Sequence, residues 1–375
     1  MASEWKTVRA ADFIEFNPRL SIKRGAMATK VAMDKLQPFT KKIPATGQAE
    51  FAGGSKFCNG DTIMARITPC LENGKTAYVD ILADGEVAFG STEFIVMRAR
   101  AGISDPQFVY YLATSPAFRN VAIKSMVGSS GRQRVQQGVL DEHELTVPPL
   151  EEQQKIGAFL AALDQKIALN NKINDNLQQQ LEALYRGTIK DSVAECESVT
   201  LDQWCHIFTG KKNANQFDED GQYMFFTCGE KPLRINSYIY DGPAIIISGN
   251  GSYTGRTLFY NGRFDLYQRT YACTLKDAIP SEYIFGLYAI LKIELHSKIA
   301  GGTHGSSIPY IVMNDLAKFE FPFNHTEFAD FSEKAKTLLT AIQHNQRQNE
   351  TLSQIRDALL PKLMSSEIDV ANFDF

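Results

Sequence analysis

The stretch LEEQQKIGAFLAALDQKIALNNKINDNLQQQLEALYRGT, residues 150–188, decides how the rest of the chain is organised. Apolar side chains recur in it at steps of four and three, the heptad pattern of a helix with one narrow hydrophobic stripe. The stripe carries Ile156, Leu160, Leu163, Ile167, Asn170, Asn174, Leu177, Leu181 and Leu184. A helix of this range would be about 58 Å long, and its single stripe needs a partner helix.

A second stretch near the end of the chain supplies that partner. Its stripe runs through Ala335, Leu338, Ile342, Asn345, Asn349, Leu352, Arg356, Leu359 and Leu363. The chain order of domain, helix, domain, helix predicts that the second helix packs antiparallel to the first. The central asparagines, Asn170 and Asn174 in one stripe and Asn345 and Asn349 in the other, are predicted to fix the registry of the pair. The alternative is that they are surface positions on amphipathic helices.

The domains that accompany these helices repeat one another. Residues 106–148 align without a gap to residues 280–322 at an offset of 174, which places Asp141 opposite Asp315. The period is too long for a solenoid unit, so each copy is a domain. Short β-rich runs, Gly-rich turns and a helix in each copy predict mixed α/β domains, with Ser104 as the N-cap of the first helix.

These patterns predict an α+β protein in which two similar mixed α/β domains are joined by two long helices. The helices pack as an antiparallel coiled coil, and the whole has approximate two-fold symmetry. The predicted boundaries are 1–148 for the first domain, 149–190 for the central spacer helix, 191–324 for the second domain and 325–375 for the C-terminal helix and tail.

Composition indicates an ordinary globular protein. Of 375 residues, 44% are hydrophobic and 22% are charged. The N-terminus lacks the apolar core of a signal peptide and no apolar run reaches about 18 residues, so we expect a cytoplasmic protein without a membrane segment. The six cysteines form no C-x-x-C pair and favour reduced thiols over a zinc site. A net charge of −4 does not exclude nucleic acid, because a local basic face is what attracts phosphates.

Catalytic patterns are absent from the sequence. It contains no G-x-x-x-x-G-K-[ST] loop, no Gly-rich loop placed between a strand and a helix, and no Asn/Asp-Pro-Pro-Tyr/Phe motif. The histidines have no repeated carboxylate or cysteine partner. We therefore expect no catalytic residue, no bound metal and no cofactor held by this chain.

The loop after each domain helix is where the two copies differ. It reads SSGRQRVQQ at 129–137 in the first copy and THGSSIPY at 303–310 in the second. Arg pairs with guanine and Gln with adenine in the major groove, and Ser or Thr contacts bases or phosphates. The same frame with different side chains is typical of two readers of different sequences; the alternative is a pair of flexible polar loops. The candidate DNA contacts are Arg66, Lys75, Ser129, Ser130, Arg132, Gln133, Arg134, Gln136 and Gln137 in the first copy, and Asn250, Tyr253, Arg256, Thr303, His304, Ser306, Ser307 and Tyr310 in the second.

Several of these segments resemble one family, the DNA specificity (S) subunits of type I restriction–modification systems. They are PPLEEQQKI at 148–156, LDQKI at 163–167, GTHGSSI at 302–308 and LLPKLMS at 359–365. The second copy departs from the pattern at 322–327, where PFNHTE replaces the Pro-Leu-x-Glu-Gln element.

The resemblance implies two target-recognition domains, each reading one half of a bipartite DNA site, held apart by the helices. It also implies that the helices dock two methyltransferase (M) subunits that use S-adenosylmethionine to methylate adenine. Two restriction (R) subunits that use ATP and Mg²⁺ would join them. The competing hypotheses are a fused DNA methyltransferase or nuclease and a non-DNA scaffold with two binding domains on a coiled-coil spacer. A steep loss of duplex affinity with added salt separates the DNA-binding reading from the scaffold.

Overall fold

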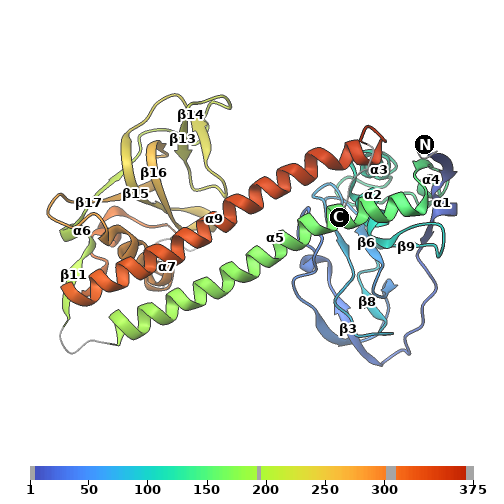
Figure 1. Cartoon of the computed structure of the whole chain (residues 1–375), viewed down its shortest axis with the longest axis horizontal. Coiled ribbons are helices and arrows are strands. Elements are labelled where there is room, and N and C mark those ends of the chain that lie inside the picture. Colours follow the sequence, from blue (N-terminus) through green and yellow to red (C-terminus); the bar gives the residue numbers. More distant parts are fainter. Residues whose placement is uncertain (1–4, 192–195, 301–309, 369–375) are drawn as a thin grey trace. The chain divides into compact units, whose positions relative to one another are not determined.

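The computed structural model describes residues 5–191, 196–300 and 310–368. The chain forms two compact units, drawn mainly in blue and cyan and in yellow and orange in Figure 1. The first comprises Met1–Asn170 and Arg347–Phe375, and the second comprises Asn171–Gln346. The two long helices are α5 (Leu150–Tyr185) and α9 (His325–Met364). Each of them contributes one part to the first unit and the other part to the second. Among the described helices, none combines the length and the apolar character needed to cross a bilayer.

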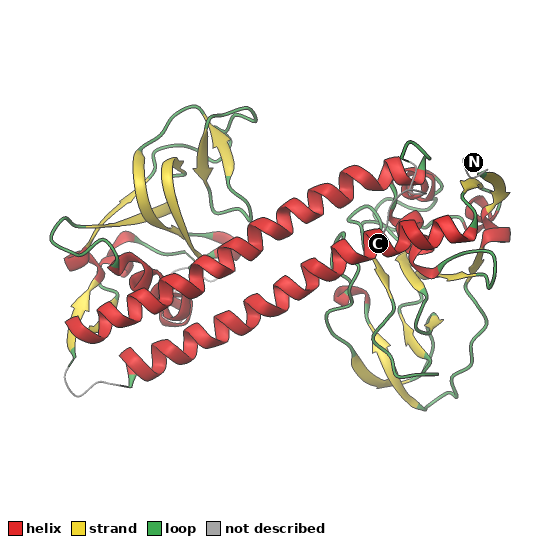
Figure 2. Cartoon of the chain, in the orientation of Figure 1, coloured by secondary structure: helices red, strands yellow, loops and turns green. Residues whose placement is uncertain are grey.

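Two four-stranded sheets form most of the β structure of the first unit, with strand orders β2-β9-β6-β7 and β4-β3-β8-β5. Figure 2 draws the strands in yellow. Side chains alternate across a strand, so the neighbours Ile63 and Met64 belong to different hydrophobic clusters. Ile63 packs with residues of the other sheet, and Met64 packs with the helices. The strands are β2 (Ile14–Phe16), β3 (Met27–Val31), β4 (Gly47–Glu50), β5 (Lys56–Phe57), β6 (Thr62–Ala65), β7 (Thr76–Tyr78), β8 (Ala88–Gly90) and β9 (Phe94–Ala99).

The short helices of the first unit are α1 (Ala10–Phe13), η1 (Met33–Lys35), α2 (Pro106–Thr114), α3 (Pro116–Lys124) and α4 (Gln137–Asp141). Two of them, α2 and α3, begin at residues whose side chains cap them. Asp105 caps α2 by accepting a hydrogen bond from the Phe108 backbone N–H at 2.9 Å, with Pro106 in the first helical position. The prediction of Ser104 as the N-cap is therefore wrong by one residue. The Ser104 hydroxyl instead donates to the Phe13 carbonyl at 2.8 Å.

A six-stranded sheet of order β12-β17-β15-β16-β13-β14 dominates the second unit. Helix α7 packs on it, and Leu287 and Ile290 share a core with Ile245 and Cys273 of the sheet. The Trp204 ring stacks on Tyr283 at a centroid distance of 5.7 Å and extends this core. The elements are α6 (Leu201–Trp204), β12 (Cys205–Thr209), β13 (Tyr223–Phe226), β14 (Leu233–Ile235), β15 (Tyr240–Ser248), η4 (Gly251–Tyr253), β16 (Thr257–Leu266), β17 (Thr270–Leu275), α7 (Tyr283–Ala300) and α8 (Met313–Ala317).

Each unit closes with the same two-stranded sheet. In the first, β1 (Lys6–Arg9) pairs antiparallel with β10 (Glu144–Val147). In the second, β11 (Glu197–Thr200) pairs antiparallel with β18 (Glu320–Phe323). The structural repeat therefore includes the first and the last strand of each domain.

The hydrogen bonds at these closing strands also correct the sequence alignment. Ala10 N–H donates to His143 O at 2.8 Å, and Leu201 N–H donates to Phe319 O at 2.9 Å. His143 and Phe319 are thus equivalent, at an offset of 176 rather than 174. Asp141 and Asp315 consequently do not occupy matching positions. The slip of two residues arises because the gapless sequence alignment carries one offset from the domain helix to the closing strand, whereas strand pairing sets the offset of the closing strands.

In the first unit the start of α5 packs against the end of α9. Leu160 is fully buried and belongs to the same hydrophobic cluster as Leu360 and Leu363. Farther along α5, the Asn170 side-chain amide donates to Asn349 Oδ1 at 2.8 Å. Rising residue numbers on one helix thus meet falling numbers on the other, which defines antiparallel packing.

The second unit shows the same packing with the other parts of the two helices. The Asn345 side-chain amide donates to Asn174 Oδ1 at 2.9 Å. Leu181 packs in one cluster with Leu339, and the Tyr185 ring lies 6.0 Å from that of Phe331. The predicted fold class, two mixed domains with an antiparallel helix pair, is confirmed. All four central asparagines take part in contacts between the helices, while their role in fixing registry stays a prediction.

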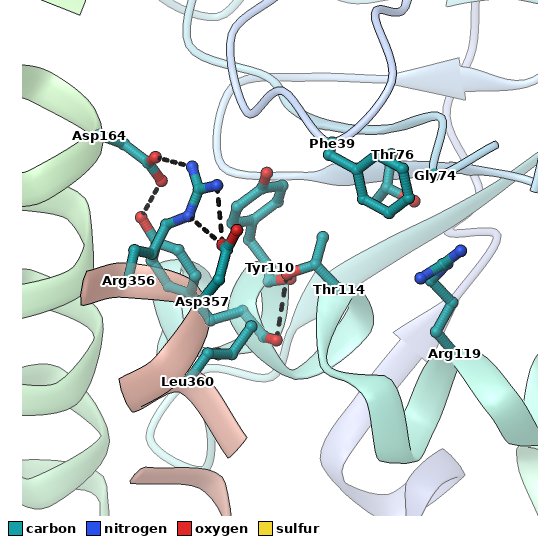
Figure 3. Close-up of a pocket in the computed structure, with 11 residues that line it drawn as sticks. Phe39, Gly74, Thr76, Tyr110, Thr114, Arg119, Asp164, Arg356, Asp357 and Leu360 are labelled. Atoms are coloured by element: carbon teal, nitrogen blue, oxygen red, sulfur yellow. Dashed lines mark hydrogen bonds and ion pairs between the residues drawn. The ribbon is translucent and has the colours of Figure 1, made fainter. Parts of the chain in front are cut away.

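A polar network connects the helix pair to α2 in the first unit (Figure 3). Asp164 accepts a hydrogen bond from Tyr111 Oη at 2.5 Å and forms an ion pair with Arg356 Nη1 at 2.6 Å. Figure 3 shows the Arg356 guanidinium held between Asp164 and Asp357. Burial, and then the charge of Asp164, raises the pKa of Tyr111, so its hydroxyl remains a donor. The network fixes the first domain on its helices.

Candidate nucleic-acid interface

The loop that follows α3 in the first unit is a closed, hairpin-like structure. Val127 N–H donates to Arg134 O at 3.0 Å, and Arg134 N–H donates to Val127 O at 2.9 Å. At the tip, Arg132 N–H donates to Ser129 O at 2.9 Å, with Gly131 at φ 77°. That left-handed conformation suits glycine, and it explains why the turn contains one. We call residues 127–135 the recognition loop.

The recognition loop is also held by the segment that follows β6. Val135 N–H donates to Arg66 O at 2.9 Å, and Thr68 N–H donates to Gln133 O at 3.0 Å. The half-buried Arg66 returns a side-chain hydrogen bond from Nη2 to Val135 O at 3.1 Å. These backbone contacts brace the recognition loop against the segment after β6.

Arg134 is neutralised by a carboxylate. Its guanidinium makes a bidentate ion pair with Glu93, with Nη2 and Oε1 2.7 Å apart. Hydrogen bonding by Arg134 lowers the pKa of Glu93 against the effect of burial. Glu93 comes directly before β9, so the pair connects the recognition loop to the sheet. Arg134 and Arg66 therefore shape the loop.

The tip of the loop leaves other candidates exposed. Ser129, Ser130 and Arg132 are exposed, and the Arg132 side chain makes no hydrogen bond or ion pair with the part of the chain that the structure describes. Gln133 is half-buried beside them. An exposed arginine on a turn that backbone hydrogen bonds stabilise is suited to bidentate contact with guanine or a phosphate.

The two glutamines after the loop differ in their availability. The exposed Gln136 donates from its side chain to Arg134 O at 3.2 Å. The Gln137 side chain donates to Asp141 at 2.9 Å and accepts from the Asn17 amide at 3.0 Å, so both of its polar atoms are engaged.

Lys75 lies apart from the loop tip. Its backbone carbonyl pairs with Ala65 N–H at 3.0 Å, next to Arg66, but its Nζ donates to Met33 O at 3.0 Å. The structure thus brings Arg66, Gln133, Arg134 and the loop tip together, and it directs the Lys75 ammonium to another part of the unit.

In the second unit, the described candidates gather at the turn between β15 and β16. Asn250 forms an isolated bridge with Tyr310, and Ile311 N–H donates to Gly249 O at 2.8 Å. Tyr253 and Arg256 follow on the same turn, with the guanidinium 4.5 Å from the ring centroid. Thr303, His304, Ser306 and Ser307 lie outside the described residues.

A pocket beside this turn contains two basic residues that sequence reasoning missed. Lys292 and His296 of α7 line it together with Tyr253 and Arg256. The signal in the sequence was a lysine and a histidine four residues apart in the predicted helix. No cluster of three or more His, Cys, Asp or Glu side chains suited to a metal occurs among the residues that the structure describes.

Comparison with known proteins follows this geometry. The family model of the type I restriction modification DNA specificity domain matches residues 2–179 and again residues 194–350. The chain belongs to this family. The family predicted from the sequence segments is thereby confirmed, and the two matches agree with the internal repeat.

The curated relatives are specificity subunits of type I restriction enzymes. The EcoDI subunit of Escherichia coli is 35% identical over 177 residues, which cover 46% of this chain and 38% of that protein. The MjaVIII subunit of Methanocaldococcus jannaschii is 20% identical over 419 aligned positions, covering 99% of this chain and 95% of the relative. The matches span only about a third of the EcoDI and EcoAI subunits, 38% and 33% of their lengths.

A solved structure shares the fold over nearly the whole chain. It is the type I restriction–modification S subunit from M. genitalium, with a TM-score of 0.59, 17% sequence identity and coverage of 96% of both chains. This likeness supports the two-domain, two-helix architecture described above.

Proposed function

We propose that this chain is the non-catalytic DNA-recognition subunit of a type I restriction–modification complex. Each recognition domain, 1–148 and 191–324, reads one half of a bipartite site. The helices over 149–190 and 325–375 space the two domains. The chain itself holds no cofactor and positions its partners on duplex DNA in the cytoplasm.

One observation carries this proposal: backbone hydrogen bonds brace the recognition loop, and its exposed Arg132 side chain makes no hydrogen bond or ion pair with the described residues. Its backbone ladder and the Arg134–Glu93 ion pair hold Arg132 at an exposed turn. A pre-shaped loop loses little conformational entropy on binding, so its side chains can discriminate between base pairs. The second domain offers a different set of side chains at its turn, as expected for a second half-site.

We propose the partners on the basis of the family. Two methyltransferase subunits dock on the helices and use S-adenosylmethionine to methylate adenine. Two restriction subunits that use ATP and Mg²⁺ complete the cleaving complex. Methylation of a duplex base requires that the base be flipped into a pocket, which is the task of the methyltransferase partner.

Salt-dependent binding tests the proposal. The chain, assembled with its methyltransferase subunits, should bind a duplex with an affinity that falls steeply between about 50 and 200 mM salt. Arg132→Ala should reduce discrimination at one base pair by about 1–3 kcal/mol while keeping the rest of the site. Affinity that is insensitive to salt would favour a scaffold that binds no DNA.

A further inference from the structure

The pocket beside the β15–β16 turn is built where the turn approaches α7. Gly255 has φ +83°, and a Cβ atom at this position would lie 3.4 Å from His296 Cα. The left-handed φ favours glycine at this position, and the turn lies in van der Waals range of the helix. The resulting cavity of about 280 Å³ has ample room for a group larger than one water molecule.

Positive charge and hydrogen-bond donors define the chemistry of this pocket. Lys292 and His296, four residues apart on one face of α7, form one side. Arg256, Tyr253, Thr254 and Thr257 line the remainder, and no carboxylate is among the described residues that line it. A cavity of this composition selects an anion.

Lys292 has no counter-charge among the residues that the structure describes. It is half-buried, and its Nζ makes no hydrogen bond or ion pair to any residue in the described ranges. Other lysines nearby are satisfied: Lys190 and Lys298 both bond Glu294 at 2.8 Å. Burial lowers the pKa of Lys292. A half-buried ammonium without a partner costs stability, and such groups are retained at binding sites.

Arg256 is already locked in place at the pocket. Its guanidinium stacks on Tyr253, donates from Nη1 to Glu230 O at 2.8 Å and donates from Nη2 to Gly229 O. Its buried Nε–H has no acceptor in the described structure. A cation held in this way needs no further ordering when an anion arrives.

We infer that this pocket receives a phosphate group of the DNA backbone, with Lys292 as the cation that contacts it. This inference rests on the proposed function. The pocket is lined by residues 252–257, which directly follow the bridge between Asn250 and Tyr310, two further candidates for DNA contact in the second unit. Phosphate contacts position a protein on the duplex while neighbouring side chains read bases. Lys292 would thus set the position of the second domain on its half-site.

The test measures duplex binding and pocket occupancy separately. The full chain, assembled with its methyltransferase subunits, is titrated with a mixed-sequence duplex over a range of salt concentrations. Lys292→Met should make the log–log salt slope about one unit shallower and weaken binding about eight-fold at 0.1 M salt. Lys292→Arg should restore most of the slope. Lys318→Met removes an exposed lysine that does not line the pocket, and it should change neither quantity.

Amine labelling of Lys292, read by mass spectrometry, identifies the source of the phosphate. Protection by the duplex at concentrations where inorganic phosphate does not protect supports a DNA phosphate. Protection by inorganic phosphate alone would overturn the DNA assignment and point to a free phosphate ligand. If wild-type binding is steeply salt-dependent but Lys292→Met matches wild type, the pocket inference fails and the proposed function stands. If wild-type binding is independent of salt, the proposed function itself fails.

Discussion

Substitution of Asp164 should destabilise the first unit strongly. Its carboxylate is 11% exposed and accepts from Tyr111 Oη at 2.5 Å and from Arg356 Nη1 at 2.6 Å. Asp164→Ala leaves the Arg356 charge, 16% exposed, with the exposed Asp357 as its remaining ion-pair partner among the described residues. Breaking a buried pair from one side costs about 3–5 kcal/mol; because these side chains are not wholly buried, we expect about 3 kcal/mol.

Urea unfolding followed by circular dichroism measures this cost, with each unit allowed its own transition. The double variant Asp164→Leu with Arg356→Met should recover most of the loss, because it removes both charges of the buried pair and leaves only the exposed Asp357 without its partner. Asp241→Ala is the matched control: its ion pair with Arg263 is half-exposed, at 52% and 50%, and should be worth less than about 1 kcal/mol. An Asp164→Ala variant no less stable than the control would refute the reasoning.

Three further predictions concern the helices and the first domain. Gly157→Ala should lower the free energy of unfolding by about 1–3 kcal/mol, because the new Cβ would lie 2.9 Å from the Cβ of Gln107. Gly187→Ala is the control: its Cβ would enter open space, so stability should stay the same or rise by up to about 1 kcal/mol. Equal effects of the two substitutions in urea unfolding would contradict the contact. Burial lowers the pKa of Lys41 from 10.5 to about 8, so between these pH values the unfolded chain binds more protons than the folded chain. Stability should therefore rise with pH in this range, by up to about 1.4 kcal/mol per pH unit relative to Lys41→Met. Parallel pH profiles of the two proteins would contradict this prediction. Leu160→Cys with Leu359→Cys should form a disulfide, mapped by mass spectrometry, that a control pair displaced by about two helical turns does not form; the reverse outcome would exclude antiparallel packing.

The helix pair could be predicted from sequence because its code is local. A stripe at steps of four and three can be recognised within one segment of sequence, without reference to distant residues. Polar residues in the middle of such a stripe, such as Asn170 and Asn345, stand out from their apolar neighbours. Their contacts with Asn349 and Asn174 follow from antiparallel packing. The division into two mixed domains was equally visible, because the chain carries the pattern twice.

The details that failed depend on partners remote in sequence. The closing strands are two residues out of the predicted register because β1 and β11 set the pairing, and no loop identity reports that. The pairing of Arg134 with Glu93, and of the Arg66 side chain with a loop carbonyl, could not be read from a loop that simply looked basic. Lys292 was overlooked because the pocket that it lines is formed with the β15–β16 turn, which is remote from it in sequence.

A map of methylated adenines across the genome tests the central claim most directly. Cells containing the chain and its methyltransferase subunits should methylate one bipartite motif that disappears when the chain is removed. Arg132→Ala should relax that motif in one half and leave the other half and the spacing unchanged. Methylation that does not depend on the chain, or a variant that alters both halves alike, would contradict the account of two domains that each read one half-site.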